Sequence, residues 1–574
     1  MKKEQNKTSI THLERTLKNV KRSFLYVGLF SFFINLLMLV PSIYMLQVYD
    51  RVLTSQSVET LGLLTLIVVF LFATMGFLEI IRSRILVRIG NKIDIELNTQ
   101  LYDTIFYSAR MSPENASVQP LNDLTKLRQF MTGNGVFAFF DSPWFPIYLF
   151  VMYLFSPWFA LFTLFAAAVI FTITLINDKT TKKFMEEANK MSFESVNYVD
   201  KNIANNEIIH AMGMNEQIKK RWLDKHLEFL NLQSNASDTS GKWSNTSKTL
   251  RQLFASLTYG IGAYLVIEGS ITPGMIIAGA VLLGRALAPI DLLTNSWKSF
   301  SDARGAYKRL NGLLEDLSTI QNTTKLPAPK GEISVEKVVV VPPHSQIEVL
   351  KNITMNIPAG TAVGVLGPSA SGKSTLLRAI LGVWPLKEGI IRLDGADIHQ
   401  WDSKELGKYI GYLPQDIELF EGTVSENVSR FAEIESEEVV KAANIAGAHE
   451  MILKLPNGYD TLIGPKGTIL SAGQRQRVGL VRALYKSPPL IVLDEPNSNL
   501  DEDGEKKLLE AIIAMKQSGS TIIIVTHRSN ILSALDTIAI LANGELKAYG
   551  NKEDVVKIMQ FQALQNYQKM KNGK

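Results

Sequence analysis

The chain has 574 residues, more than one hydrophobic core usually organises, so we expect at least two domains. Hydrophobic residues make up 46% of it, and its mean hydropathy of +0.08 favours a membrane protein. The formal net charge of +5 is small for this length, and the basic residues are spread along the chain, which argues against nucleic-acid binding. The absence of cysteine excludes disulfides, thiolate metal sites and a cysteine nucleophile.

The front half of the chain contains six long apolar runs that fit the roughly 20 residues a helix needs to cross a bilayer. The fifth run is the weakest. Buried helices of a soluble protein are the alternative, but runs this long with so few charges argue against them. The predicted spans are residues 23–46, 61–80, 136–155, 158–176, 253–267 and 275–293.

Charge predicts the direction of these spans. Lysines and arginines precede the first span and follow the second, fourth and sixth, whereas the loops near Arg51, Ser156 and Glu268 carry little positive charge. By the positive-inside rule, both ends of the chain are expected in the cytoplasm. The basic and then apolar start resembles a signal peptide, but its apolar run is too long and lacks a cleavage site, so we expect an uncleaved anchor.

The segment before the first span is predicted to be a cytoplasmic amphipathic helix. Ile10, Leu13, Leu17 and Val20 share one helical face, with basic residues elsewhere, as in helices that lie on a membrane surface. A partly disordered tail is the alternative.

The back half begins with a phosphate-binding pattern. An apolar strand pattern at residues 361–366 runs into the sequence Gly-Pro-Ser-Ala-Ser-Gly-Lys-Ser and then into a helical pattern. In such a P-loop, glycines let the backbone wrap the phosphate, and N–H groups of the loop and helix face the anion. Lys373 is expected to reach the β- and γ-phosphates and to act in catalysis, and Ser374 to bind Mg²⁺. The residues predicted to bind ATP here are Gly367, Pro368, Ser369, Ala370, Ser371, Gly372, Lys373, Ser374 and Thr375.

A second apolar run, residues 490–493, ends in two carboxylates, Asp494 and Glu495. Buried parallel strands read as continuous apolar runs, and ligands bind at their carboxyl ends. We therefore expect Asp494 to hold Mg²⁺ and Glu495 to polarise the attacking water. A third run, residues 521–526, precedes His527; a structural role is the usual alternative for such a histidine, but its place after the carboxylates favours contact with the γ-phosphate.

These patterns predict a membrane α-helical domain followed by an α/β P-loop nucleotide-binding domain. Two prolines mark the connection between them. The predicted division is a cytoplasmic amphipathic helix at 1–22, a transmembrane domain of six helices with cytoplasmic extensions at 23–315, a linker at 316–330 and the nucleotide-binding domain at 331–574.

The segment 470–474, Leu-Ser-Ala-Gly-Gln, lies between the P-loop and the carboxylates, and with it residues 331–550 resemble the ATP-binding-cassette family. The segment is similar to that family's signature motif, with alanine where a second glycine is commoner. In this resemblance Gln415 corresponds to the Q-loop, which contacts nucleotide and Mg²⁺, residues 500–501 to the D-loop and His527 to the switch histidine. It also implies a homodimer in which ATP lies between the P-loop of one chain and Ser471, Gly473 and Gln474 of the other.

A finer resemblance extends over the whole chain. Residues 47–53, 140–144, 284–289 and 496–501 are similar to bacterial type I secretion exporters, above all to the branch that exports metalloproteases and lipases. This likeness implies an inner-membrane exporter of an unfolded polypeptide with a C-terminal signal, together with a periplasmic adaptor protein, an outer-membrane channel and membrane lipid. The alternatives are export of lipid or small hydrophobic molecules, and an ATP-gated regulator or channel that does not pump.

One stretch departs from the family pattern, and one charged residue lies inside an apolar run. Many family members have an aromatic residue before the P-loop that stacks on adenine. Residues 338–344, the corresponding stretch here, contain no phenylalanine, tyrosine or tryptophan. Arg285 lies within the sixth span, about 15 Å from Met275 at roughly 1.5 Å per residue, where a charge costs at least about 2.5–3.5 kcal/mol. It is expected either to form an ion pair with Asp141 or Asp291, or snorkel, or to line the export path.

Overall fold

The computed structural model describes residues 12–111, 117–203, 205–318, 326–343, 345–464, 467–528, 530–555 and 557. They divide into two compact units: a helical unit of residues 12–105 and 117–318, and a sheet unit of residues 106–111 and 326–557. Of the sequence predictions, Ile10, residues 319–325 of the linker and His344 lie outside the described residues.

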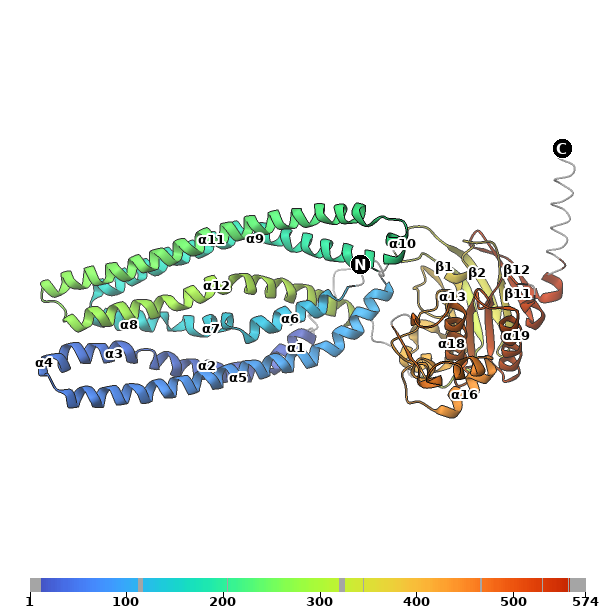
Figure 1. Cartoon of the computed structure of the whole chain (residues 1–574), viewed down its shortest axis with the longest axis horizontal. Helices are drawn as coiled ribbons and strands as arrows, with labels where there is room; N and C mark the ends of the chain where they lie inside the picture. Colours follow the sequence, from blue (N-terminus) through green and yellow to red (C-terminus); the bar gives the residue numbers. More distant parts are fainter. Residues whose placement is uncertain are drawn as a thin grey trace, which may run out of the picture. The chain divides into compact units, whose positions relative to one another are not determined.

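The helical unit consists of long helices joined by short connections (Figure 1). Their bounds are α1 (His12–Asn19), α2 (Lys21–Leu37), α3 (Val40–Gln47), the π-helix η1 (Val48–Val52), α4 (Leu53–Ser55), α5 (Val58–Met111, whose last turns belong to the sheet unit), α6 (Gln119–Thr132), α7 (Asn134–Asp141), η3 (Ser142–Trp144), α8 (Phe145–Phe155), α9 (Pro157–Ile203), α10 (Asn206–Ala211), α11 (Asn215–Ile267) and α12 (Pro273–Ser318).

Six helical segments among the described residues are long and apolar enough to cross a membrane, and this confirms the six predicted spans. The weak fifth run is the end of α11, one of the longest helices. Large apolar side chains on these segments remain uncovered by the chain; Leu66 and Phe70 of α5, for example, are each 68% exposed. Such side chains fit a lipid environment.

Four helices continue from apolar sequence into mixed sequence. The helices α5, α9 and α12 end at residues 111, 203 and 318, and α11 begins at residue 215, each far from its apolar run. The helices α9 and α11 lie side by side (Figure 1). The first span, in contrast, is interrupted between α2 and α3, and Pro41 lies in the first turn of α3, where its missing N–H removes no helical bond.

The apolar face of the N-terminal helix is covered by protein. Leu13 and Val20 are buried and belong to one core cluster with Leu310 and Leu314 near the end of α12. This burial accounts for an ordered α1 in front of the first span.

The sheet unit is an α/β domain with a central six-stranded sheet in the order β12-β11-β3-β10-β9-β6. Its four-stranded antiparallel sheet has the order β2-β1-β4-β5. The strands are β1 (Ile333–Val340), β2 (Leu350–Ile357), β3 (Ala362–Leu366), β4 (Glu388–Leu393), β5 (Ala396–Asp397), β6 (Ile410–Leu413), β7 (Gly422–Thr423), β8 (Leu462–Ile463), β9 (Leu490–Asp494), β10 (Thr521–Val525), β11 (Thr537–Ala542) and β12 (Glu545–Asn551). The helices are α13 (Lys373–Ile380), η4 (Ile398–Gln400), α14 (Ser403–Leu406), η5 (Gly407–Tyr409), α15 (Val424–Val428), α16 (Ser436–Ile445), α17 (His449–Leu453), η6 (Gly458–Asp460), α18 (Ala472–Leu484), α19 (Glu502–Gln517) and η8 (Ile531–Ala534).

The apolar composition of the central strands explains their burial. Strands β9 and β10 are buried along their whole length, as expected for parallel strands covered on both faces. Strands β11, β3, β10, β9 and β6 run parallel, and only β12 pairs antiparallel at the edge. Their carboxyl ends therefore meet at one edge of the sheet, where ligands bind in such folds.

Candidate nucleotide site

The strand register brings the predicted site residues to the same edge. Val525 of β10 lies beside Asp494 of β9 and beside Val365 of β3. Glu495 follows the end of β9 directly, and His527 lies two residues beyond the end of β10. The P-loop begins directly after β3. The P-loop and the two carboxylates, more than 100 residues apart in the sequence, thus follow strands that end at the same edge of the sheet.

The P-loop connects β3 to α13 through two glycines in left-handed conformations. At Gly367 (φ +155°) a Cβ would lie 2.1 Å from the carbonyl oxygen of Leu541, and at Gly372 (φ +99°) it would lie 2.7 Å from a methyl group of Leu350. Only glycine fits these positions without displacing its neighbours. Between them, Ala370 also has a left-handed backbone, with φ +62°.

Two side chains of the P-loop that can donate hydrogen bonds, Lys373 and Ser371, are buried. Lys373 is buried, and its Nζ donates to the carbonyl oxygens of Gly367 and Pro368, both at 2.9 Å. Ser371 is buried as well, and its Oγ has no hydrogen-bond partner among the described residues. Ser369 is exposed at the tip of the loop. The arrangement fits an anion that would accept from the lysine, the serine and the first N–H groups of α13.

Asp494 has the surroundings of a metal ligand. It is 2% exposed, and its Oδ1 has no hydrogen-bond partner among the described residues. Burial raises the pKa of its carboxyl group, while a hydrogen bond with Ser374 acts in the opposite direction. A buried carboxylate oxygen beside a hydroxyl group is a ligand pair that Mg²⁺ prefers. Thr375, next along α13, is buried.

Two side chains from separate loops converge at Glu495. Gln415, two residues beyond β6, donates from its Nε2 to Oε2 of Glu495 at 3.2 Å. The Nε2 of His527 lies 3.5 Å from Oε1 of the same carboxylate. The backbone of Glu495 has φ +50°, a strained conformation for a residue with a Cβ. One carboxylate oxygen thus accepts a hydrogen bond and the other lies near an imidazole nitrogen, an arrangement that orients a candidate general base.

Gln476, a residue that the sequence analysis missed, forms hydrogen bonds with the backbone of the loop that carries Glu495. It is 1% exposed, and its Nε2 donates to the carbonyl oxygens of Glu495, at 3.4 Å, and of Pro496. Its Oε1 accepts from the backbone N–H of Asn499 at 2.9 Å. A signal was present in the sequence, because Gln476 lies four residues before Leu480 on the buried face of α18.

The signature segment forms the start of α18. Ser471 caps this helix and accepts from the backbone N–H of Gln474, whose side chain accepts in return from the Ser471 N–H at 2.8 Å. A Cβ at Gly473 would lie 3.0 Å from the carbonyl oxygen of Asn499, so the segment packs closely against the loop after β9. Ser471 is exposed. Within the described part of the chain, no hydrogen bond or ion pair joins Ser471, Gly473 or Gln474 to the P-loop.

The hairpin loop before β2 lies next to the P-loop. The N–H of Val349 donates to the carbonyl oxygen of Val340 at 2.9 Å, and a Cβ at Gly372 would lie 3.5 Å from a methyl group of Val349. The described residues of this loop, 341–343 and 345–349, include no aromatic side chain. An adenine bound beside this loop would therefore find no aromatic ring among its described residues to stack on.

Comparison with known proteins identifies the two units. The family model described as "ABC transporter" matches residues 350–498, and the one described as "ABC transporter transmembrane region" matches residues 24–288. A solved structure of a bacterial Atm1-family ABC exporter with ATP bound superposes with a TM-score of 0.78 over 94% of this chain and 96% of that one, at 21% identity. The fold and the site therefore define an ABC transporter subunit.

Full-length relatives narrow the class further. The type I secretion system ATP-binding protein PrsD of Rhizobium meliloti is 42% identical over 94% of this chain and 93% of its own length. The cyclolysin secretion/processing ATP-binding protein CyaB of Bordetella pertussis is 29% identical over 92% and 75%. The chain belongs to the ATP-binding-cassette exporters of type I secretion systems. It is a multi-pass inner-membrane protein that binds ATP and couples its hydrolysis to transport.

Proposed function

We propose that the chain is the ATP-driven subunit of a type I secretion system that exports a polypeptide, unfolded and carrying a C-terminal signal, across the inner membrane. The observation that carries this proposal is the 42% identity to a type I secretion ATP-binding protein over almost the full length of both chains. A periplasmic adaptor, an outer-membrane channel and membrane lipid are its proposed partners. The lysines and arginines beside the spans support cytoplasmic positions for both ends of the chain.

The active form is proposed to be a homodimer. The chain has one P-loop and one signature segment, and the latter, at the start of α18, makes no polar contact with the P-loop among the described residues. The exposed Ser471 and the N–H groups of Gly473 and Gln474 can supply phosphate donors at this helix N-terminus only to a second copy. Each ATP would then be held between two chains.

The residues of the sheet edge have proposed roles in hydrolysis. Lys373 neutralises charge on the β- and γ-phosphates, and His527 contacts the γ-phosphate. Asp494 and Ser374, with Gln415, fit Mg²⁺, which when bound neutralises phosphate charge. Glu495, held by Gln415 and His527, polarises the attacking water. Phosphoryl transfer needs chiefly such positioning and charge stabilisation.

Deleting the gene and comparing the proteins of the culture medium tests this function. We expect at least one protein to disappear from the medium and to return when the wild-type gene, but not the Lys373→Ala variant, is supplied. An unchanged set of secreted proteins, together with altered export of a lipid or small hydrophobic molecule, would contradict polypeptide export.

A further inference from the structure

Arg285 places a charge inside the membrane. It lies in the segment Pro273–Thr294 of α12, and the twelve residues that separate it from Pro273 span about 18 Å of helix. The apolar core of a bilayer is about 30 Å thick, so Arg285 lies near its middle. A guanidinium at this depth is costly when it faces lipid and is expected to face protein or water.

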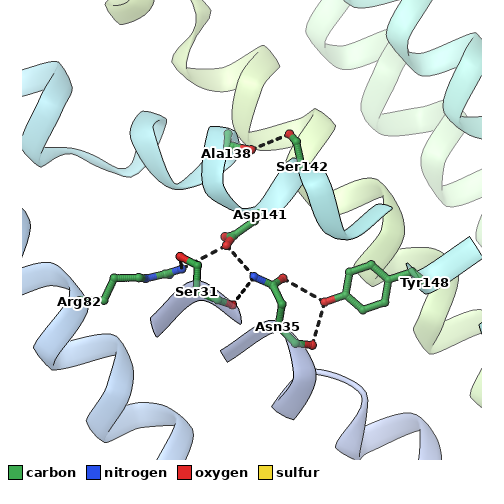
Figure 2. Close-up of polar contacts among 7 residues, drawn as sticks. All are labelled: Ser31, Asn35, Arg82, Ala138, Asp141, Ser142 and Tyr148. Atoms are coloured by element: carbon green, nitrogen blue, oxygen red, sulfur yellow. Dashed lines mark hydrogen bonds and ion pairs between the residues drawn. The ribbon is translucent and has the colours of Figure 1, made fainter. Parts of the chain in front are cut away.

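The carboxylates proposed as its partners in the sequence are already used. Asp291 pairs with Arg251 of α11. Asp141 pairs with Arg82 of α5 at 3.2 Å and accepts from Asn35 of α2 at 2.7 Å (Figure 2). Arg285 itself makes no hydrogen bond or ion pair with any residue that the structure describes. The interpretation of Arg285 as one half of a structural ion pair is therefore wrong for both candidates.

The hydroxyl group of Tyr148, near Arg285, is already hydrogen-bonded to another residue. Tyr148 of α8, which lies within electrostatic range of Arg285, donates to Oδ1 of Asn35 at 3.0 Å (Figure 2). Asp141, Asn35 and Tyr148 are thus hydrogen-bonded to groups other than Arg285, and Nε of Arg82 has no partner among the described residues. None of these groups makes a hydrogen bond with the guanidinium of Arg285, so its donors are open to an acceptor from another molecule.

Arg285 lies on the less covered face of α12. Ile277, Val281, Gly284, Arg285 and Ala288 follow one another at helical spacing, and each is only partly covered or exposed. The residues between them are buried against other helices of the same chain; these are Leu282, Leu283, Ala286 and Leu287. Apart from its chain neighbours and the backbone of α12, no described atom lies within 4 Å of a Cβ built on Gly284, so the helix surface is open at this position.

The backbone at Arg285 adds an acceptor to these donors. Pro289 lies inside α12, four residues later. Proline has no N–H group, so it cannot make the helical hydrogen bond to the carbonyl oxygen of Arg285. Arg285 thus combines a forked cationic donor with a carbonyl group that lacks its usual helical partner, next to the buried Pro289.

We propose that Arg285 is a contact point for the exported polypeptide inside the membrane, an assignment that rests on the function proposed above. Its guanidinium donates to carbonyl or carboxylate oxygens of the passing chain, and its carbonyl oxygen accepts from a peptide N–H. Both groups suit an extended backbone of varied sequence. In a symmetric dimer the two equivalent faces would carry like charges, which disfavours dry packing against each other and favours a hydrated path between them.

Cysteine accessibility tests the hydrated path without a substrate. The chain has no cysteine, so Arg285→Cys introduces a single thiol. The purified dimer in lipid nanodiscs is treated with a negatively charged, membrane-impermeant methanethiosulfonate, with and without ATP. The controls are Phe165→Cys on α9, which is 58% exposed in a membrane segment, and Leu287→Cys, which is buried. We expect position 285 to react at least about tenfold faster than both, because a thiol in apolar surroundings stays protonated. Equal protection of all three positions would overturn the proposal.

Secretion tests the contact itself. The protein that disappears from the medium on gene deletion is measured in strains with Arg285→Gln, Arg285→Lys and Pro289→Ala. We expect Arg285→Gln to lower its export about tenfold, the factor expected for losing one hydrogen bond to a charged group. Arg285→Lys keeps the charge without the fork and Pro289→Ala returns the carbonyl to the helix, so both should give intermediate export.

Two further measurements separate the explanations. Basal ATP hydrolysis and the elution volume of the purified dimer should match wild type in all three variants, which excludes misfolding. Normal export by Arg285→Gln would overturn the contact even if the position is hydrated. If deletion removes no protein from the medium, the proposed function fails and the polypeptide contact fails with it, whereas the thiol reaction still reports whether the path holds water.

Discussion

Glu495 illustrates how single residues define this site. It lies directly after β9 with a φ of +50°, and its two carboxylate oxygens face Gln415 and His527. A non-glycine residue in this conformation costs of order 1–3 kcal/mol, and such strain persists where the surrounding structure holds it. Here the buried Gln476 holds the loop through the carbonyl oxygens of Glu495 and Pro496.

Glu495→Gln tests the role of this carboxylate. The amide keeps the size of the side chain but cannot accept a proton, so ATP binding should be retained. Hydrolysis should fall at least about tenfold, since a positioned base contributes roughly 10²–10⁴-fold. Phosphate release and equilibrium ATP binding measure the two effects. Glu502→Gln, on the exposed first turn of α19, is the matched control and should behave as wild type. Near-normal turnover in Glu495→Gln would remove Glu495 as the base.

Asp494 gives a prediction about pH. Burial raises the pKa of its carboxyl group in the folded state, so the native chain binds this proton more tightly than the unfolded chain. The contribution of this group to the free energy of unfolding therefore falls as pH rises from the unfolded-state pKa through the higher folded-state pKa. Asp494→Asn should remove that decline and raise the unfolding temperature at neutral pH in the absence of Mg²⁺ and ATP.

The same variant should lose the stabilisation that Mg²⁺ adds in the presence of ATP, because the buried Oδ1 is its proposed ligand. Thermal unfolding at several pH values, with and without Mg²⁺ and ATP, measures both effects. The exposed Asp503→Asn is the control. Equal stabilisation by Mg²⁺ in wild type and Asp494→Asn would exclude Asp494 as a ligand.

At the scale of the elements, a polar network ties the first three spans together. Arg82 of α5 donates to Ser31 of α2 at 3.0 Å and pairs with Asp141 at the end of α7, and its guanidinium stacks 4.1 Å from the ring centre of Phe137. The Arg82 and Asp141 side chains are only 6% and 10% exposed. A buried pair of this kind contributes little by itself but leaves a costly charge behind when one partner is removed.

Arg82→Met and Asp141→Leu should therefore each destabilise the helical unit by about 3–5 kcal/mol. The double variant should recover much of this loss, because it leaves no uncompensated charge. Thermal unfolding in detergent, followed by tryptophan fluorescence, measures the three variants against wild type. Arg84→Met, at an exposed position on the same helix, is the control. Additive losses in the double variant would show that the two charges are not coupled.

At the scale of the whole molecule, the proposed dimer makes each ATP site depend on two chains. A chain with both Lys373→Ala and Ser471→Arg lacks both halves, so a mixed dimer with wild type has no intact site. With equal amounts of the two chains, ATP hydrolysis should fall to roughly a quarter, the fraction of dimers with two wild-type chains. The measurement is the rate of phosphate release at several mixing ratios. A decline in linear proportion to the wild-type fraction would show that one chain is sufficient.

The sequence by itself determined the features that depend on near neighbours. Apolar runs long enough to span a bilayer, a strand that leads into a glycine-rich loop and a helix, and carboxylates at a strand end are all local patterns, so the six spans and the P-loop domain were predictable from it. The order of the motifs carried the resemblance to the secretion exporters.

Tertiary structure alone decided which distant residues meet. Strand register brings Gln415 and His527 to Glu495, although neither is close to it in the sequence. Packing of separate spans pairs Asp141 with Arg82, so Arg285 has no ion-pair partner among the described residues. The physical reason is that hydrophobic periodicity fixes which face of each element is buried, whereas the partner on that face is chosen by how whole helices and strands pack.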